Sequence, residues 1–181
     1  MSDPCCDVED FNGETRYIIG DQDVNFNSHK SSFDIAVSKT SNPTTLTAAD
    51  WNFYKIDTTE ANCDADYPGN FHNTGDALVF TLNMFAVGGT TGTYHTQIVS
   101  IPLADLFNGV TTPQVFHNDL ADFNLRPIAM HDGPIGGPEY RNRSRSGAGG
   151  TGKLVFAQSA KSATSSACLL DRRLLPSRSP H

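Results

Sequence analysis

The sequence has no long apolar run and little sign of helix. Its hydrophobic content is 38%, and no segment approaches the ~20 apolar residues that a membrane-spanning helix requires. Apolar residues do not recur at helical spacing, apart from one or two turns expected at Pro102–Phe107. These absences exclude a helical membrane protein and a helical bundle, and they favour a mainly β chain rich in Asp, Asn, Thr, Ser and Gly.

Positive charge is scarce in most of the chain. Residues 1–138 contain 5 Lys and Arg against 18 Asp and Glu, a net charge of −13, whereas residues 139–181 contain 8 against 2, a net charge of +6. An acidic body of this kind argues against nucleic acid as a partner.

Cysteine spacing typical of metal sites is also missing. The chain contains Cys5, Cys6, Cys63 and Cys168, with no CxxC pair and no Cys/His ligand spacing, so no zinc site is expected. A disulfide from Cys5 or Cys6 to Cys63 stays open for an oxidising compartment. Isolated reduced thiols are the simpler expectation.

What the sequence does contain is a series of short strand-like runs. The strongest pair is Ala77–Phe85 and Thr96–Leu103, and the Gly/Thr segment Gly88–Gly92 between them predicts an antiparallel hairpin. Residues 1–12 are expected to be irregular, and residues 21–29 a polar loop. Further strands are predicted at Thr15–Gly20, Ser32–Ser38, Trp51–Asp57 and Thr112–His117.

The strands recur about every 60 residues. Ile98 follows Ile35 by 63 positions and Thr112 follows Trp51 by 61. A fixed period indicates a repeat architecture, and four short strands per repeat would make a long propeller blade. We therefore predict an all-β fold, a partial β-propeller with meander four-stranded blades. The blades are expected at about 11–60 and 64–120, with the start of a third at 124–140, in a domain 1–140 followed by an irregular basic tail, 141–181.

Several segments also look like parts of a known family. The chain resembles blades of sialidase-like (BNR-type) secreted β-propeller proteins over about residues 11–140, in the segments Ile35–Pro43, Trp51–Asp57, Asp66–Pro68 and Asp76–Phe85. The resemblance implies a propeller fold and little about activity. The Ser-x-Asp-x-Gly-x-x-Trp box of sialidase blades is absent, and residues 1–138 hold only Arg16 and Arg126 where an arginine cluster would bind a substrate carboxylate.

The two ends of the chain leave alternatives open. The resemblance implies an extracellular or cell-surface parent, whereas the acidic start Met1–Asp7 has no signal-peptide pattern. The protein is thus expected either to stay inside the cell or to lack the start of a longer secreted chain. Near residue 141 the strand pattern ends and the charge reverses, which suggests a premature end or frame change in a propeller gene, or a natural disordered tail.

One acidic stretch predicts a metal site. Asp21, Asp23 and Asn25 provide alternating oxygen ligands as in a calcium loop. However, Phe26 stands where such loops have Gly, and Ser32 where they have Glu. Calcium is the one cofactor predicted, and the alternative is a solvated acidic loop.

The remaining motifs give weaker predictions of function. Gly147–Lys153 matches a phosphate-binding loop but lacks the flanking strand and helix, so we expect a flexible linker. His72 and His131 occupy equivalent repeat positions, which predicts a structural role. Carboxylates available for glycoside hydrolysis, which needs a pair ~5–10 Å apart, are Asp64, Asp66, Asp76 and Asp132. Aromatic residues expected to pack between blades, with a ligand platform as the alternative, are Tyr17, Phe33, Trp51, Phe53, Phe80, Phe85 and Phe116.

Together these features predict a non-catalytic binding or scaffold module derived from an extracellular β-propeller, with a glycan or a protein as its ligand. The alternatives are a fragment of a sialidase-like glycoside hydrolase and a truncated product without independent activity. No catalytic residue is assigned.

Overall fold

The structure is a computed structural model that describes residues 4–73, 77–87, 94–121, 125–127, 138–143 and 154–158. These residues form eleven strands and one short helix, α1 (Leu103–Phe107). The strands are β1 (Cys5–Phe11), β2 (Glu14–Asn25), β3 (Lys30–Ser38), β4 (Trp51–Asp57), β5 (Cys63–Asn73), β6 (Ala77–Ala86), β7 (His95–Pro102), β8 (Phe116–Leu120), β9 (Leu125–Pro127), β10 (Pro138–Arg143) and β11 (Leu154–Gln158).

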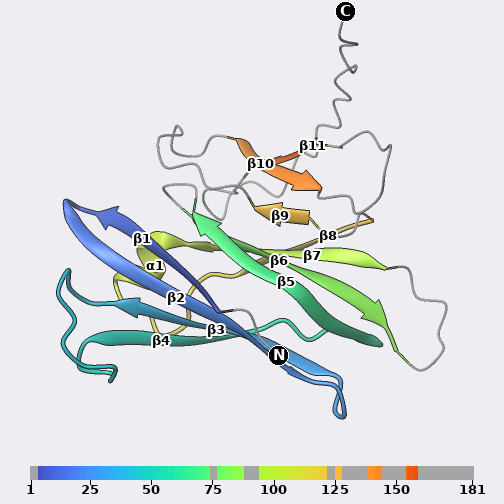
Figure 1. The fold of residues 1–181 in the computed structure, drawn as a ribbon, viewed down its shortest axis with the longest axis horizontal. Coiled ribbons are helices and arrows are strands. Elements are labelled where there is room, and N and C mark those ends of the chain that lie inside the picture. Colours follow the sequence, from blue (N-terminus) through green and yellow to red (C-terminus); the bar gives the residue numbers. More distant parts are fainter. Residues whose placement is uncertain are drawn as a thin grey trace, which may run out of the picture.

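The strands build separate antiparallel sheets in chain order. The first sheet has the order β1-β2-β3-β4, the second β5-β6-β7-β8, and a third, three-stranded sheet β11-β10-β9. Figure 1 shows the three stacked, with the second between the first and the third. The predicted all-β class is confirmed, and the same four-stranded meander occurs twice in succession.

The alternation of buried and exposed side chains explains why β3 and β4 form strands of the first sheet. Phe33, Ile35 and Val37 of β3 are buried against the second sheet, while Asp34, between two of them, is exposed. Their partners on β4 follow the same alternation, since Tyr54 pairs with Ile35 and is buried too. The period-2 pattern predicted at Ser32–Ser38 is thus confirmed.

Aromatic rings join the first two sheets. The ring of Phe33 stacks on that of Phe80 at 4.2 Å between centroids, and the edge of Phe71 meets Phe33 at 6.2 Å. Gly20 of β2 faces the same rings, because a Cβ added there would lie 2.6 Å from Phe33 and 2.7 Å from Phe71. The absence of a side chain at Gly20 lets the sheets approach.

Strand β6 of the second sheet is buried on both faces. Every residue of β6 from Ala77 to Met84 is buried. On the face away from the first sheet, Val79 packs with Leu125 of β9, and the Thr81 hydroxyl donates a hydrogen bond to the Leu125 carbonyl at 2.7 Å. A strand covered on both sides has no solvated face, which explains why β6 is the strongest apolar run in the sequence.

Two segments predicted without regular structure are strands. Residues 1–12 were expected to be irregular, but β1 pairs with β2 along its length, with Val8 opposite Tyr17. The loop predicted at residues 21–29 is wrong as well, because β2 continues to Asn25, where it pairs with Lys30 of β3. In both cases pairing with a neighbouring strand outweighs the weak strand propensity of Asp and Asn.

The C-terminal half also departs from prediction. The strand expected at Thr112–His117 begins only at Phe116, since the Gln114 N–H donates to the Asp105 carboxylate at 2.8 Å instead of to a ladder. The tail predicted to be irregular, residues 141–181, contains the end of β10 and all of β11, which pair with each other. The other residues of that tail lie outside the described part of the chain.

The predicted aromatic packing holds only in part. Phe33 and Phe80 lie between the first two sheets, as expected. Tyr17 and Phe53 point away from the second sheet instead, and the side chain of Phe53 is 57% exposed. Trp51 is buried at the end of β4, where its indole N–H donates to the Thr45 carbonyl at 2.7 Å.

Substituting Gly20 tests the contact between the sheets. We expect Gly20→Ala to lower the free energy of unfolding by about 1–3 kcal/mol, because the new methyl group overlaps two packed rings. Urea denaturation would measure the loss. The control Ala36→Ser, on the opposite side of the sheet, should change stability by less than about 0.5 kcal/mol. A Gly20→Ala variant as stable as the parent would contradict this account of the interface.

Candidate functional site

The first sheet has an outer face that points away from the second sheet. In the β3–β4 ladder, Asp34 lies directly opposite Lys55 on this face. Ser32 lies between Asp23 of β2 on one side and Asp57 of β4 on the other. Because side chains alternate along a strand, the three strands bring these groups together in one charged and hydroxylic patch. The ionisable residues of this outer face include Asp21, Asp23, Asp34, Lys55 and Asp57.

A pocket opens at one end of this outer face, where the β2–β3 turn meets the end of β4. It has a volume of about 510 Å³, and we call it the polar pocket. Each of its lining side chains carries a charge, an amide or a hydroxyl, so a ligand there would meet both donors and acceptors. The lining residues are Asp23, Asn25, Ser28, Lys30, Ser31, Ser32, Lys55, Asp57 and Thr59.

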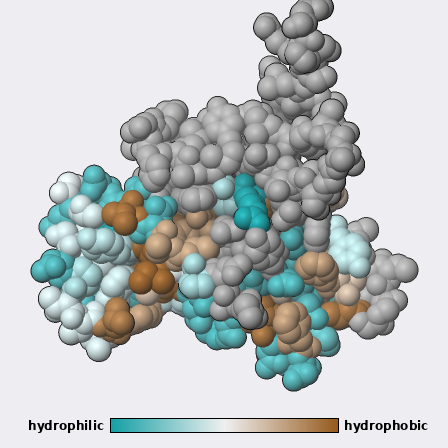
Figure 2. Space-filling model, in the orientation of Figure 1, coloured by the Kyte–Doolittle hydropathy of each residue, from teal (hydrophilic) through white to brown (hydrophobic). Residues whose placement is uncertain are grey.

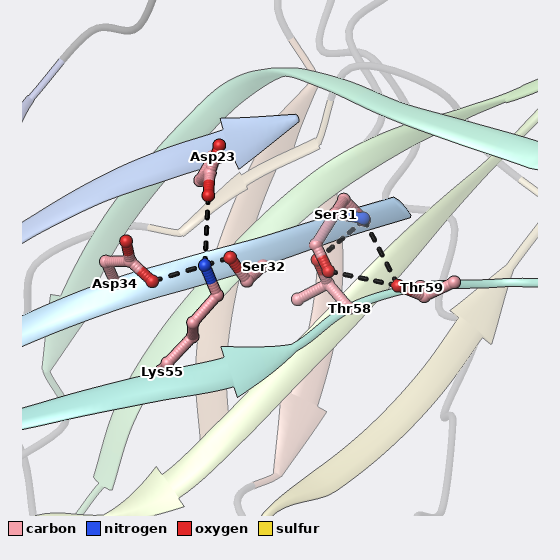
Figure 3. A network of polar contacts seen from close by, with 7 residues as sticks. All are labelled: Asp23, Ser31, Ser32, Asp34, Lys55, Thr58 and Thr59. Carbon is pink, nitrogen blue, oxygen red and sulfur yellow. Dashed lines mark hydrogen bonds and ion pairs between the residues drawn. The ribbon is translucent and has the colours of Figure 1, made fainter. Parts of the chain in front are cut away.

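Lys55 stands at the centre of the charged groups. Its Nζ contacts the Asp23 carboxylate at 3.0 Å (Figure 3). This hydrogen bond and the nearby charge of Asp34 raise the pKa of Lys55. Both partners of the ion pair are more than half exposed, so the pair contributes little to stability. Its exposed groups are therefore available to a ligand.

A second group of hydrogen bonds closes the end of the pocket. The Ser31 N–H donates to Thr59 Oγ1 at 3.2 Å, and the Thr58 hydroxyl donates to Ser31 Oγ at 2.8 Å (Figure 3). The Thr59 N–H in turn donates to the Asp57 carboxylate at 2.9 Å. The bonds from Thr59 lower the pKa of Asp57, so this carboxyl is ionised at neutral pH.

An apolar pocket of about 450 Å³ lies beside the polar one. Ile19, Ala36 and Phe53 contribute to its wall, and Lys55 lines both pockets. Phe53 and Ile19 are 57% and 39% exposed. On the side of the molecule drawn in Figure 2, apolar areas also lie directly beside hydrophilic ones. The outer face thus offers an exposed aromatic ring next to charged groups.

The residues predicted to bind calcium do not surround one point. Asp23 pairs with Lys55, and the Asn25 side-chain oxygen accepts bonds from the N–H groups of Asn27 and Ser28, both at 3.1 Å. Asp21 accepts from the Gln22 N–H at 2.8 Å. Along an extended strand, positions 21 and 25 are about 13 Å apart. Calcium binding by Asp21, Asp23 and Asn25 stays a prediction, and Asp23 and Asn25 line the polar pocket.

The other predicted residues are scattered. The Asp64 carboxylate contacts His29 Nδ1 at 3.0 Å, and Asp66 is exposed on β5, which also contains His72. No disulfide joins Cys5, Cys6 and Cys63 to one another in the structure. Candidates that lie outside the described residues are Asp76, Gly88–Gly92, His131, Asp132, Gly147–Lys153 and Cys168.

Sequence reasoning missed Lys55 as a ligand contact, although its side chain lines both pockets. Phe53 is one of the aromatic residues expected to pack between blades, with a ligand platform as the alternative, and the structure places it exposed in the apolar pocket. The usable signal was the alternation of Trp51, Phe53 and Lys55 on one face of a strand, which the structure confirms. Which face is covered depends on the partner sheet, and a single strand does not encode that.

Comparison with known proteins does not assign the chain to a family. No protein-family model matches it, and searches of curated proteins and of solved structures gave no match. Among the described residues, no helix is long and apolar enough to cross a membrane. The sialidase-like resemblance thus stays a prediction.

The acidity of Asp57 tests the geometry of the polar pocket. Carbon-detected NMR titration of its carboxyl should give a pKa below the ordinary value, and Thr59→Val should move it partway back, since the side-chain bond is lost and the N–H bond is kept. Because the pKa of Asp57 is lowered by folding, the ionised carboxyl stabilises the fold at a pH above its pKa in the unfolded chain, about 3.9. This contribution is lost as the pH falls through the lower pKa of the folded state.

The control for this titration is Thr45→Val. Thr45 bonds the Asp50 carboxylate through its N–H at 2.7 Å and its hydroxyl at 2.9 Å, so Asp57 should titrate unchanged in that variant. An Asp57 carboxyl that titrates at or above its ordinary value in the parent protein would contradict the described bonds.

Proposed function

We propose that this chain is a non-catalytic carbohydrate-binding module built from consecutive blades of propeller type. One observation carries the binding function: the polar pocket around Asp23, Lys55 and Asp57 lies directly beside the exposed ring of Phe53. The ligand class follows from the chemistry of these two adjoining pockets.

The succession of sheets supports the propeller part of the proposal. Propeller blades are four-stranded sheets that stack face to face around an axis. The first and second sheets are both four-stranded meanders in chain order, and β9 packs on the far side of the second sheet. Three successive sheets thus pack in sequence order, as consecutive blades do.

Sugars match the outer face because they are amphipathic. The C–H face of a pyranose ring is apolar and packs well on an aromatic ring, while its hydroxyls both donate and accept hydrogen bonds. Here Phe53 offers the ring, Lys55 offers a donor, and Asp57 offers an acceptor. Ligand sites commonly combine such an apolar contact with a few placed polar groups.

Charge argues that this outer face is open to a ligand rather than covered by a further sheet. Burying ionised carboxylates and an ammonium group beneath an apolar surface would cost several kcal/mol each unless every charge were paired. The outer face carries at least five such groups, among them Asp21 and Asp34. A hydrated, hydroxyl-rich ligand avoids that cost.

The acid–base properties favour binding over hydrolysis. A glycosidase needs one carboxyl with a raised pKa as its general acid. The pKa of Asp57 is lowered instead, and Asp23 is held by Lys55. Among the described residues that line the polar pocket there is also no arginine to bind a sialic acid carboxylate. A fragment of a sialidase-like hydrolase is therefore the second candidate function.

Glycan-array screening followed by calorimetry with the best ligand tests the proposal. We expect Phe53→Ala to weaken binding about two- to tenfold, the effect of losing one aromatic contact worth ~0.5–1.5 kcal/mol. Lys55→Met should weaken it to a similar degree. Phe26→Ala is the matched control, because Phe26 is 56% exposed but lines neither pocket; its affinity should stay within about twofold of the parent value.

Two results would count against this function. Turnover of chromogenic glycosides that is lost in Asp57→Asn would favour the hydrolase. A change in oligomeric state, and not in glycan affinity, on Phe53→Ala would mean that the outer face contacts protein. Size-exclusion chromatography of both phenylalanine variants distinguishes the second case.

A further inference from the structure

Three side chains with metal-binding atoms meet at one end of the second sheet. Glu60 lies in the connection before β5, Cys63 is the first residue of β5, and His95 is the first residue of β7. One ligand atom from each lies within 4.8 Å of the other two. His95 Nε2 and Glu60 Oε2 are in direct contact at 2.8 Å.

The backbone holds these three positions together. Cys63 N–H donates to the Glu60 carbonyl at 3.3 Å, which closes a turn in which Asn62 has a left-handed φ of 62°. In the sheet, Cys63 pairs with Ala86 and His95 pairs with Met84. Ala86 and Met84 are two residues apart on β6, so Cys63 and His95 flank that strand on the same face.

The cluster is partly shielded from water. The side chains of His95 and Glu60 are 16% and 28% exposed, and the Cys63 thiol is half-buried against the main core. Burial raises the pKa of Cys63, and so do the charges of Glu60, Asp119 and Asp64. The thiol therefore lies in a negative local field.

Thiol, imidazole and carboxylate each offer one ligand atom to a single cation. These three atoms lie within 4.8 Å of one another, and they come from two strand ends and the connection that precedes β5. A divalent cation among them would be attracted by the Glu60 carboxylate and would stabilise the thiolate form of Cys63.

We infer that Glu60, Cys63 and His95 form a zinc-binding site whose fourth position is open to water or a small ligand. Thiolate, imidazole and carboxylate are the ligands that zinc takes in proteins, and sites with three protein ligands keep one position open. On binding, the Cys63 S–H bond is replaced by an S–Zn bond and the proton passes to solvent. His95 binds through the lone pair of its neutral ring, and Glu60 as a carboxylate.

The geometry needs only small side-chain shifts. Zinc–ligand bonds of about 2.0–2.3 Å at tetrahedral angles separate neighbouring ligand atoms by about 3.3–3.8 Å. The contact between Glu60 and His95, at 2.8 Å, must open slightly. Separations of up to 4.8 Å must close by about an ångström, within the reach of side-chain rotation in a loop residue and two strand ends.

Titration of the full chain with zinc chloride alone, against a chromophoric chelator, tests the site. We expect one zinc per chain with a dissociation constant below about 1 µM. Co²⁺ in place of zinc should show thiolate-to-cobalt charge-transfer absorption. Cys63→Ser should abolish this absorption, and both Cys63→Ser and His95→Gln should weaken zinc binding on the order of 100-fold. The matched controls Cys6→Ser and Cys168→Ser should bind as the parent does.

A measurement on the parent protein keeps the inference testable if a variant does not fold. One equivalent of zinc should protect Cys63 from alkylation, read by peptide mass spectrometry, while the exposed Cys6 still reacts. The inference is overturned if zinc binds more weakly than about 10 µM, if it leaves Cys63 alkylation unchanged, or if folded Cys63→Ser keeps the cobalt charge-transfer band.

Discussion

The structure depends on how closely the first two sheets approach each other. That approach is set where the rings of Phe33 and Phe80 stack at 4.2 Å and Gly20 leaves room for Phe71. Closely packed interiors have no spare volume, so this contact determines which face of each strand is covered. Once the inner face of the first sheet is covered, the alternation of the strands leaves its charged side chains on the outer face.

Both candidate sites are consequences of strand register. The polar pocket exists because β2, β3 and β4 align Asp23, Ser32 and Asp57 across the outer face. The Glu60–Cys63–His95 cluster exists because β6 spaces β5 and β7 so that two strand ends meet on one face. A slip of one residue in any of these ladders would turn the ligand atoms to the opposite face.

The two sites differ in burial, and this difference separates their chemistry. At the polar pocket, Lys55 and Asp23 are more than half exposed, so their charges are hydrated and suit a polar, hydroxyl-rich ligand. The Glu60–Cys63–His95 cluster is more enclosed, and the electric field of its carboxylates is less screened by water. Partial burial of a soft ligand atom among carboxylates favours a divalent metal over a neutral ligand.

The all-β class, the repeated meander and most strand positions could be predicted from the sequence, because period-2 alternation is a local property of the chain. The pattern predicts β4 at Trp51–Asp57 and the apolar run of β6, but not the burial of β6 on both faces. Three features follow from tertiary contacts alone: Asp21 and Asn25 extend a strand, Phe53 faces outward, and Glu60 contacts His95. These outcomes depend on strand pairing and sheet packing between residues far apart in the chain, and no local pattern encodes such contacts.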